Sequence, residues 1–335
     1  MNLEELTLGI SHFEQQLVFR ATLFNMLRLL ACTVVTLVVS LCHLEAAECA
    51  VTRQIARGDT IRELAEFYFG DTQYWPAIVL ATNSRKDFTF ISDLNDVHRI
   101  PKLCIPEIAE AERWRLRYKR YLAAMGEAGL PEPWKIAPKL VEIPADQPVT
   151  VSSWIREAQL NAFRDSTGKW VDRAPSELWV TVEPYLRKFC AAFVSAHGSD
   201  LDQLALRLEQ RLGLPPASNK THFLEIHLAR PEPDVIFRPC VNPSTITTNC
   251  TVGPPPAGVD ERHKNWIYHQ YYSSYGQGRL SSFPWTALGY TFDWAPGPQG
   301  NSDFQRFGES EFVIRQGAPI EIVQAVSTAE YCKPN

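Results

Sequence analysis

The sequence predicts an α+β protein: a small βααβ module, then a helix, a proline-rich linker and a second α+β domain with an antiparallel sheet. Three observations support this fold class. Apolar residues recur at helical spacing in several segments, and they alternate with polar residues in shorter segments of the second half. The 24 prolines outnumber the 17 glycines, which is typical of a chain with many ordered loops.

Composition limits the class of partner. The 335 residues are 45% hydrophobic and 21% charged, enough to bury a core. The chain has 33 basic and 38 acidic residues, a formal net charge of −5. Because this balance provides no broad cationic face, we expect no nucleic-acid partner.

Residues 1–48 are expected to be a signal peptide or N-terminal extension. The uncharged apolar run from Leu29 to Cys42 follows Arg28. Its length fits the roughly 7–15 residues of a signal-peptide core, whereas a spanning helix needs about 20. We therefore expect an exported protein of the periplasm, cell envelope or extracellular space. An uncleaved anchor, which would be the membrane contact, and a buried helix of a cytosolic protein are the alternatives.

The cysteines outside this segment point to disulfides rather than a metal site. Six remain, an even number, and none are spaced as CxxC: Cys49, Cys104, Cys190, Cys240, Cys250 and Cys332. In an oxidising compartment such cysteines pair. Cys240 with Cys250, across a short loop, and Cys190 with Cys332 are candidate pairs.

The first element is a strand followed by a capped helix. Val51 to Ile55 reads as a short strand. Thr60 and Glu63 have the spacing of a capping box. The helix that follows carries one apolar stripe, Ile61, Leu64, Ala65 and Tyr68, and Gly70 is a natural C-cap.

A second helix and a second strand come next. Asp71 or Thr72 can cap the helix, and Pro76 suits its first turn. Its apolar face is formed by Trp75, Ile78, Val79 and Thr82, and it ends near Asn83. After a polar loop, Lys102 to Pro106 reads as a strand closed by proline.

This order resembles a LysM module over about residues 51–106, a sixth of the chain. The motifs that carry the resemblance are Gly58-Asp59-Thr60-Ile61, Phe69-Gly70-Asp71, Trp75-Pro76-Ala77-Ile78, Asn83 and Leu103-Cys104-Ile105-Pro106. Two departures bear on the sugar groove. The loop Ser84–Val97 is long, and Arg99-Ile100-Pro101 replaces the usual turn glycine.

The resemblance implies binding of peptidoglycan or a chitin-like glycan containing N-acetylglucosamine. One wall of the groove would be Gly58, Asp59, Thr60 and Ile61, and the other Asn83, Ser84 and Ile91. Tight turns would hydrogen-bond the N-acetyl groups, with Ile61 or Ile91 against the methyl. The alternative is that Asp59 and Thr60 only cap the helix and Trp75 is core.

The resemblance also implies that the two strands pair antiparallel, which would bring Cys49 near Cys104. A disulfide there would hold the module together. It would further require that signal cleavage falls before Cys49.

A long helix and a proline-rich linker follow the module. Glu107 to Met125 is acidic early and basic late, which suits the helix dipole, and Gly126 is expected to end the helix. Its predicted apolar face is Ile108, Ala111, Tyr118, Leu122 and Met125. Leu130 to Pro148 has the composition of a semi-rigid linker. The expected domains are thus 49–107 and 150–335, joined by 108–149.

The second half predicts a mixed domain. Trp154–Phe163 and Asp200–Leu212 read as helices, and Pro184 suits a helix start. Strands are expected at Phe223–Leu228, Val235–Phe237 and Glu311–Ile314, the last turning through Gly317 into Ile320–Val323.

Few features of the second half indicate chemistry. GxSxG, HExxH, P-loop and GxGxxG motifs are absent, and we expect no cofactor and no metal. Glu309 and Glu311 share a strand face, but no acid–base partner is evident. Ten aromatic residues between Trp266 and Trp294 either stack on sugars or form core, and core is favoured.

The sequence therefore favours an exported envelope protein that binds glycan through its βααβ module. An enzyme is not the leading hypothesis. The alternatives are a wall-targeted hydrolase with an unrecognised catalytic domain, and an envelope assembly protein whose module binds a protein partner instead of sugar.

Overall fold

The computed structural model describes residues 48–144, 146–244, 250–275, 280, 282–298 and 303–334. The predicted export segment lies outside the described residues. The part of the chain from Glu48 onward forms one compact unit, and its division into domains at 107 and 149 stays a prediction. Within these described ranges, no helix combines the length and hydropathy needed to cross a membrane.

The first part has two strands and two helices in the expected order. They are β1 (Val51–Gln54), α2 (Ile61–Phe69), α3 (Trp75–Asn83) and β2 (Lys102–Ile105), with 3₁₀ turns η1 (Thr72–Tyr74) and η2 (Leu94–Arg99). β1 and β2 pair antiparallel, with Val51 opposite Ile105. Thr60 caps α2, and Gly70 ends it in the left-handed conformation. These local signals are confirmed because caps act within one turn of helix.

The long helix α4 (Ile108–Ala128) differs from its predicted face and end. The side chains it buries include Ala111, Tyr121, Ala124 and Ala128, whereas Ile108 and Leu122 are half exposed. Ala111, Tyr118 and Met125 lie on the packed side as predicted, and the prediction was wrong for Ile108 and Leu122. The difference arises because α4 packs on two partners, α3 and β7, and small residues allow close approach on both. Gly126 continues the helix, which ends where the N–H of Gly129 bonds the Met125 carbonyl.

The proline-rich segment after α4 packs against the rest of the molecule. It contains the 3₁₀ turn η3 (Pro133–Lys135). The Lys135 ammonium is buried and donates to the carbonyls of Glu127 and Leu130, at 2.7 and 2.8 Å. Beyond it, Leu140 and Ile143 are buried.

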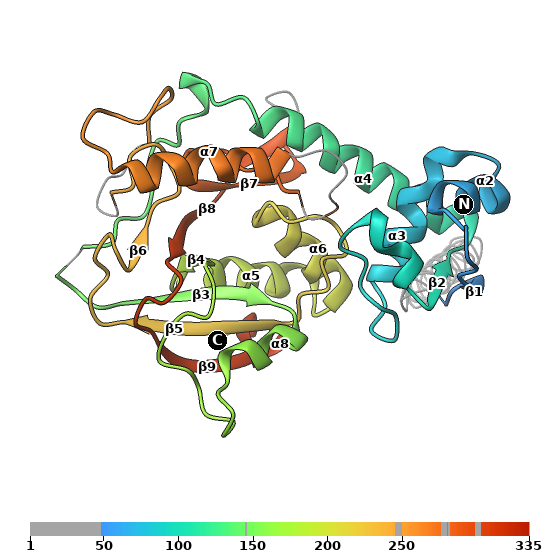
Figure 1. The fold of residues 1–335 in the computed structure, drawn as a ribbon, viewed down its shortest axis with the longest axis horizontal. Coiled ribbons are helices and arrows are strands. Elements are labelled where there is room, and N and C mark those ends of the chain that lie inside the picture. The colour runs from blue at the N-terminus through green and yellow to red at the C-terminus, as the bar shows by residue number, and fades with distance from the viewer. Residues whose placement is uncertain are drawn as a thin grey trace, which may run out of the picture. The chain divides into compact units, whose positions relative to one another are not determined.

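The second part is built on an antiparallel sheet (Figure 1). Its strands are β3 (Val149–Ile155), β4 (Leu178–Val182), β5 (His222–Leu228), β6 (Ile236–Phe237), β7 (Tyr290–Pro296), β8 (Phe304–Ile314) and β9 (Glu321–Ser327). Its helices are η4 (Glu157–Phe163), α5 (Tyr185–His197), α6 (Leu201–Arg211), α7 (Glu261–Tyr275) and α8 (Thr328–Tyr331). The strand order is β6-β8-β4-β3-β5-β9, with β7 paired to β8. The α+β class is thus confirmed.

One expectation for this part was wrong. The first two residues of the predicted helix Trp154–Phe163 belong to the central strand β3, and the segment that follows is a 3₁₀ helix, η4. β3 lies between two paired strands, and both of its faces are buried. Its apolar residues therefore occur on both faces and do not alternate with polar residues as they would in a half-buried strand. The strands expected on either side of Gly317 are present as parts of β8 and β9, and β8 joins β4 whereas β9 joins β5 at the sheet edge.

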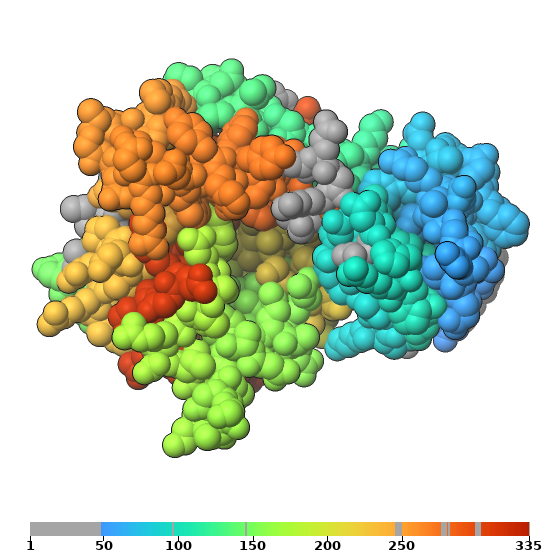
Figure 2. Space-filling model, viewed as in Figure 1, coloured from blue at the N-terminus to red at the C-terminus, as the bar shows by residue number. Residues whose placement is uncertain are grey.

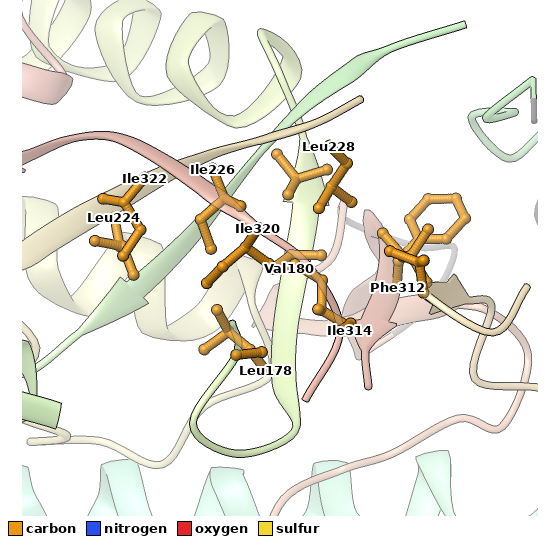
Figure 3. Close-up of a cluster of buried hydrophobic side chains, with 14 of the residues drawn as sticks. Leu178, Val180, Leu224, Ile226, Leu228, Phe312, Ile314, Ile320 and Ile322 are labelled. Atoms are coloured by element: carbon orange, nitrogen blue, oxygen red, sulfur yellow. The ribbon is translucent and has the colours of Figure 1, made fainter. Parts of the chain in front are cut away.

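The two faces of this sheet bury different clusters. On one face lie apolar side chains that include Val180, Leu224 and Phe312 (Figure 3). On the other face, Trp154 and Phe223 pack with α5, α6 and α8. Strand alternation assigns residues opposite one another to the same face.

Candidate functional site

The turn between β1 and α2 is fixed by Asp59. Its carboxylate accepts from the backbone N–H of Ala56 at 2.9 Å and from the Arg53 guanidinium at 3.2 Å. The Ala56 N–H, and then Arg53, lower the pKa of Asp59 below its usual value. Gly58 has φ +97°, a conformation that favours glycine. Asp59 therefore holds the turn in one shape.

The residues of this turn differ in their exposure. Gly58 and Thr60 are exposed and Asp59 is half-buried, whereas Ile61 is 5% exposed in the core. Thr60 caps α2 by accepting from the Glu63 N–H at 3.2 Å. The part of this predicted wall that a ligand can reach is thus the backbone around Gly58 and the Thr60 side chain.

On the second predicted wall, Asn83 and Ile91 are bonded to each other. The Asn83 amide donates to the Ile91 carbonyl at 2.9 Å and accepts from the Ile91 N–H at 2.7 Å. Both residues are buried. Ser84 is partly exposed, and its hydroxyl donates to the Ala81 carbonyl at 2.9 Å. Asn83 therefore fastens the long loop to the end of α3.

The two walls share one buried base. Ile61 and Ile91 belong to the same cluster, with Leu64, Ile78 and Leu103. Trp75 is half-buried, with its ring 5.3 Å from that of Tyr118. The exposed turn at Gly58 and the segment at Ser84 are thus attached to the same hydrophobic core. Their contact with glycan stays a prediction. In residues 48–334 as described, no group of three His, Cys, Asp or Glu is placed to hold a metal ion.

Three disulfides join all six candidate cysteines. The pairs are Cys49–Cys104, Cys190–Cys332 and Cys240–Cys250, with Cα–Cα distances of 5.2, 5.1 and 6.1 Å. The pairings expected from the sequence and from the LysM resemblance are therefore confirmed. Because disulfides persist in oxidising compartments, they indicate a non-cytoplasmic environment.

Comparison of this chain with protein-family models, curated proteins and solved structures finds no match.

The aromatic residues between Trp266 and Trp294 include buried, half-buried and exposed rings. Trp285, Tyr290, Phe292 and Trp294 are buried, as the core interpretation expects. Trp266 and Phe283 are half-buried and pack with Trp179 of β4, at ring distances of 6.0 and 5.9 Å. Tyr268 and Tyr272 lie exposed on α7.

A row of polar side chains crosses the helix-covered face of the sheet. Each member lies directly opposite the next on the neighbouring strand: Glu311, Thr181, Ser152, Glu225 and Gln324. Arg187 of α5 bonds Glu225 and forms an ion pair with Glu183 at 3.5 Å. The Tyr331 hydroxyl donates to Glu183 at 2.5 Å. Sequence analysis found Glu311 but not its neighbours, because they come from strands far apart in the chain.

Proposed function

We propose that this protein is an exported envelope protein that binds an N-acetylglucosamine-containing glycan, such as peptidoglycan, through residues 51–106. Three features support the proposal. The β1-α2-α3-β2 order matches the arrangement that the LysM resemblance implies, the Cys49–Cys104 bond closes it, and the disulfides fit an exported chain.

The observation that carries the proposal is the fixed, exposed turn at Gly58. Asp59 holds its backbone in place, and rigid turns present amide and carbonyl groups without an entropic cost on binding. An uncharged N-acetyl sugar needs a few such polar contacts beside apolar surface.

The test uses a glycine pair in the same module. Gly58 and Gly70 both have positive φ, +97° and +73°, and a Cβ at either would meet nothing within 4 Å. Asn is among the non-glycine residues most often found at positive φ, so Gly58→Asn adds a side chain over the predicted groove and Gly70→Asn adds one at the far end of α2. Both substitutions strain the backbone, and thermal melting of each variant verifies that it is folded. The full chain, produced in an exporting host, is mixed with insoluble peptidoglycan and with chitin, and the pelleted fraction is measured.

We expect Gly58→Asn to reduce pelleting at least tenfold and Gly70→Asn to leave it unchanged. Ile61 is unsuitable as a probe because its loss would open a cavity in the core. Equal pelleting of both variants would place the contact elsewhere. Failure of the unmodified protein to pellet with either polymer would overturn the proposal and favour a protein partner.

A further inference from the structure

A pocket lies at the end of the sheet where β5 ends and β9 begins. Its volume is about 450 Å³, within the roughly 300–1,000 Å³ that is typical of small-molecule sites. His227 and Glu321 are opposite each other at this end of the two strands, and both line the pocket. Figure 2 shows the gold segment after β5 beside the red segment before β9 at the surface of the molecule.

The floor of the pocket is apolar and belongs to the hydrophobic core. Val235 is 9% exposed and Ile320 is 7% exposed, and both line the pocket. They belong to the cluster on the aliphatic side of the sheet, in which Figure 3 labels Ile320 and Val180. Pro319 adds further apolar surface to the lining. An apolar group placed here would therefore leave water for a fixed apolar surface.

Backbone hydrogen bonds hold the two loops around this floor. The Val235 N–H donates to the Glu232 carbonyl at 2.8 Å and closes a turn in the loop after β5. The Arg315 N–H donates to the Val235 carbonyl at 2.9 Å and joins the two loops, and the Ile320 N–H donates to the Asp172 carbonyl at 2.9 Å. Because the pocket is already shaped, binding requires little ordering of the protein.

Charged side chains of both signs stand on the rim. Arg230, Glu232 and Glu321 line the pocket and are exposed. Within the ranges that the structure describes, none of these three charged groups forms an ion pair or a hydrogen bond with the protein. The buried Pro231 separates Arg230 from Glu232 along the chain. The rim thus offers a guanidinium to a carboxylate and two carboxylates to an ammonium group.

We propose that this pocket binds a short peptide that carries both a free ammonium group and a free carboxylate. Arg230 binds the carboxylate, and Glu232 and Glu321 bind the ammonium group. An apolar side chain of the peptide packs on Val235 and Ile320. An uncharged sugar would leave the rim charges unmatched, and a simple ion would leave the apolar floor uncovered. The inference is independent of the proposed glycan binding, because the pocket uses residues outside the βααβ module.

The test titrates the full chain, produced in an exporting host, with the dipeptide alanyl-leucine and follows binding by calorimetry. Its N-acetylated form lacks the ammonium charge, and its C-terminal amide lacks the carboxylate. We expect each derivative to bind about tenfold more weakly than the dipeptide, because each leaves a rim charge unmatched. Equal affinity for all three compounds would overturn the proposal.

Two variants assign the two charges. Arg230→Gln should weaken binding of the dipeptide about tenfold and leave binding of the amide unchanged, since the amide has no carboxylate to lose. Glu232→Gln should weaken binding of the dipeptide and spare the N-acetylated form. Asp234→Asn is the matched control, because Asp234 is an exposed acid of the same loop that does not line the pocket. Circular dichroism melting verifies that each variant is folded.

The glycan proposal and the peptide proposal fail separately. Gly58→Asn should leave binding of the dipeptide unchanged, and Arg230→Gln should leave pelleting with peptidoglycan unchanged. No binding of the dipeptide at millimolar concentration, or full affinity of Arg230→Gln, would overturn the peptide site even if the protein pellets with glycan.

Discussion

Single side chains fix the two loops on which the glycan proposal depends. Asp59 ties the turn before α2, and Asn83 ties the loop after α3 to Ile91. Both residues were expected to touch sugar. Their observed bonds act on backbone shape, which a sequence motif alone does not distinguish from ligand contact.

Loss of the Asn83 amide should therefore destabilise the protein. Asn83→Ala leaves a buried N–H and a buried carbonyl of Ile91 without these partners, and we expect the free energy of unfolding to fall by about 1–3 kcal/mol. Urea unfolding measures the change. Ser84→Ala, which removes one partly exposed bond, is the control and should cost less. Equal losses of unfolding free energy would show that the two hydrogen bonds between Asn83 and Ile91 stabilise the protein no more than the single bond of Ser84.

Glu311 should make stability depend on pH. Its folded-state pKa of about 8 lies above the ordinary value of 4.5. Its contribution is therefore fully present below about pH 4.5 and is lost as the pH rises toward 8. The difference in unfolding free energy between Glu311→Gln and the unmodified protein should grow across this window in favour of the variant, and then level. Denaturant unfolding at pH 5, 7 and 9 tests this, and a constant difference would contradict it.

For the helices and strands, sequence features that act within one element predicted its ends correctly. Contacts between segments far apart in the chain could not be predicted in this way. Thr60 and Gly70 bound α2 as expected because a cap bonds within its own helix. On α4, the burial of Ile108 and Leu122 was wrongly predicted because two different neighbours select the residues that the helix buries. Glu311, Thr181 and Ser152 become neighbours only through the order of the strands, for which none of these residues carries a sequence signal.

The disulfides should differ in their contribution to stability. In the chain-entropy model a bond stabilises more as the loop it closes lengthens. Removing Cys49–Cys104, with a separation of 55, by Ala at both positions should cost about 4 kcal/mol. Removing Cys240–Cys250, with a separation of 10, should cost about 3 kcal/mol. Thermal and denaturant unfolding of the two double variants gives the comparison, and the reverse order would show that packing outweighs loop length.

Helix α4 connects the βααβ module to the sheet of the second part. Near its start, Glu110 pairs with Arg85 at 3.4 Å, and Tyr74 bonds Glu112. Toward its end, the Tyr121 hydroxyl donates to the Ser282 carbonyl at 2.6 Å, and Glu127 pairs with Arg306 at 3.1 Å. One rigid helix thus contacts both parts.

We therefore expect residues 48–334 to unfold in one cooperative transition. Calorimetry should give a single peak, and tryptophan fluorescence and far-ultraviolet circular dichroism should report the same midpoint. Two separated transitions would instead support an independently folding module at 49–107. Oxidised protein is required, since reduction would change the transitions.

The strand order, in which neighbouring strands are often far apart in sequence, also affects how the chain folds. β1 and β2 both belong to residues 51–105, so the first part can close before the second half of the chain has been synthesised. β4 must wait for β8, and β5 for β9, which are among the last segments to emerge. Until then β4 and β5 each expose an unpaired edge, so during synthesis the second half should depend on chaperones that shield nascent strands from aggregation.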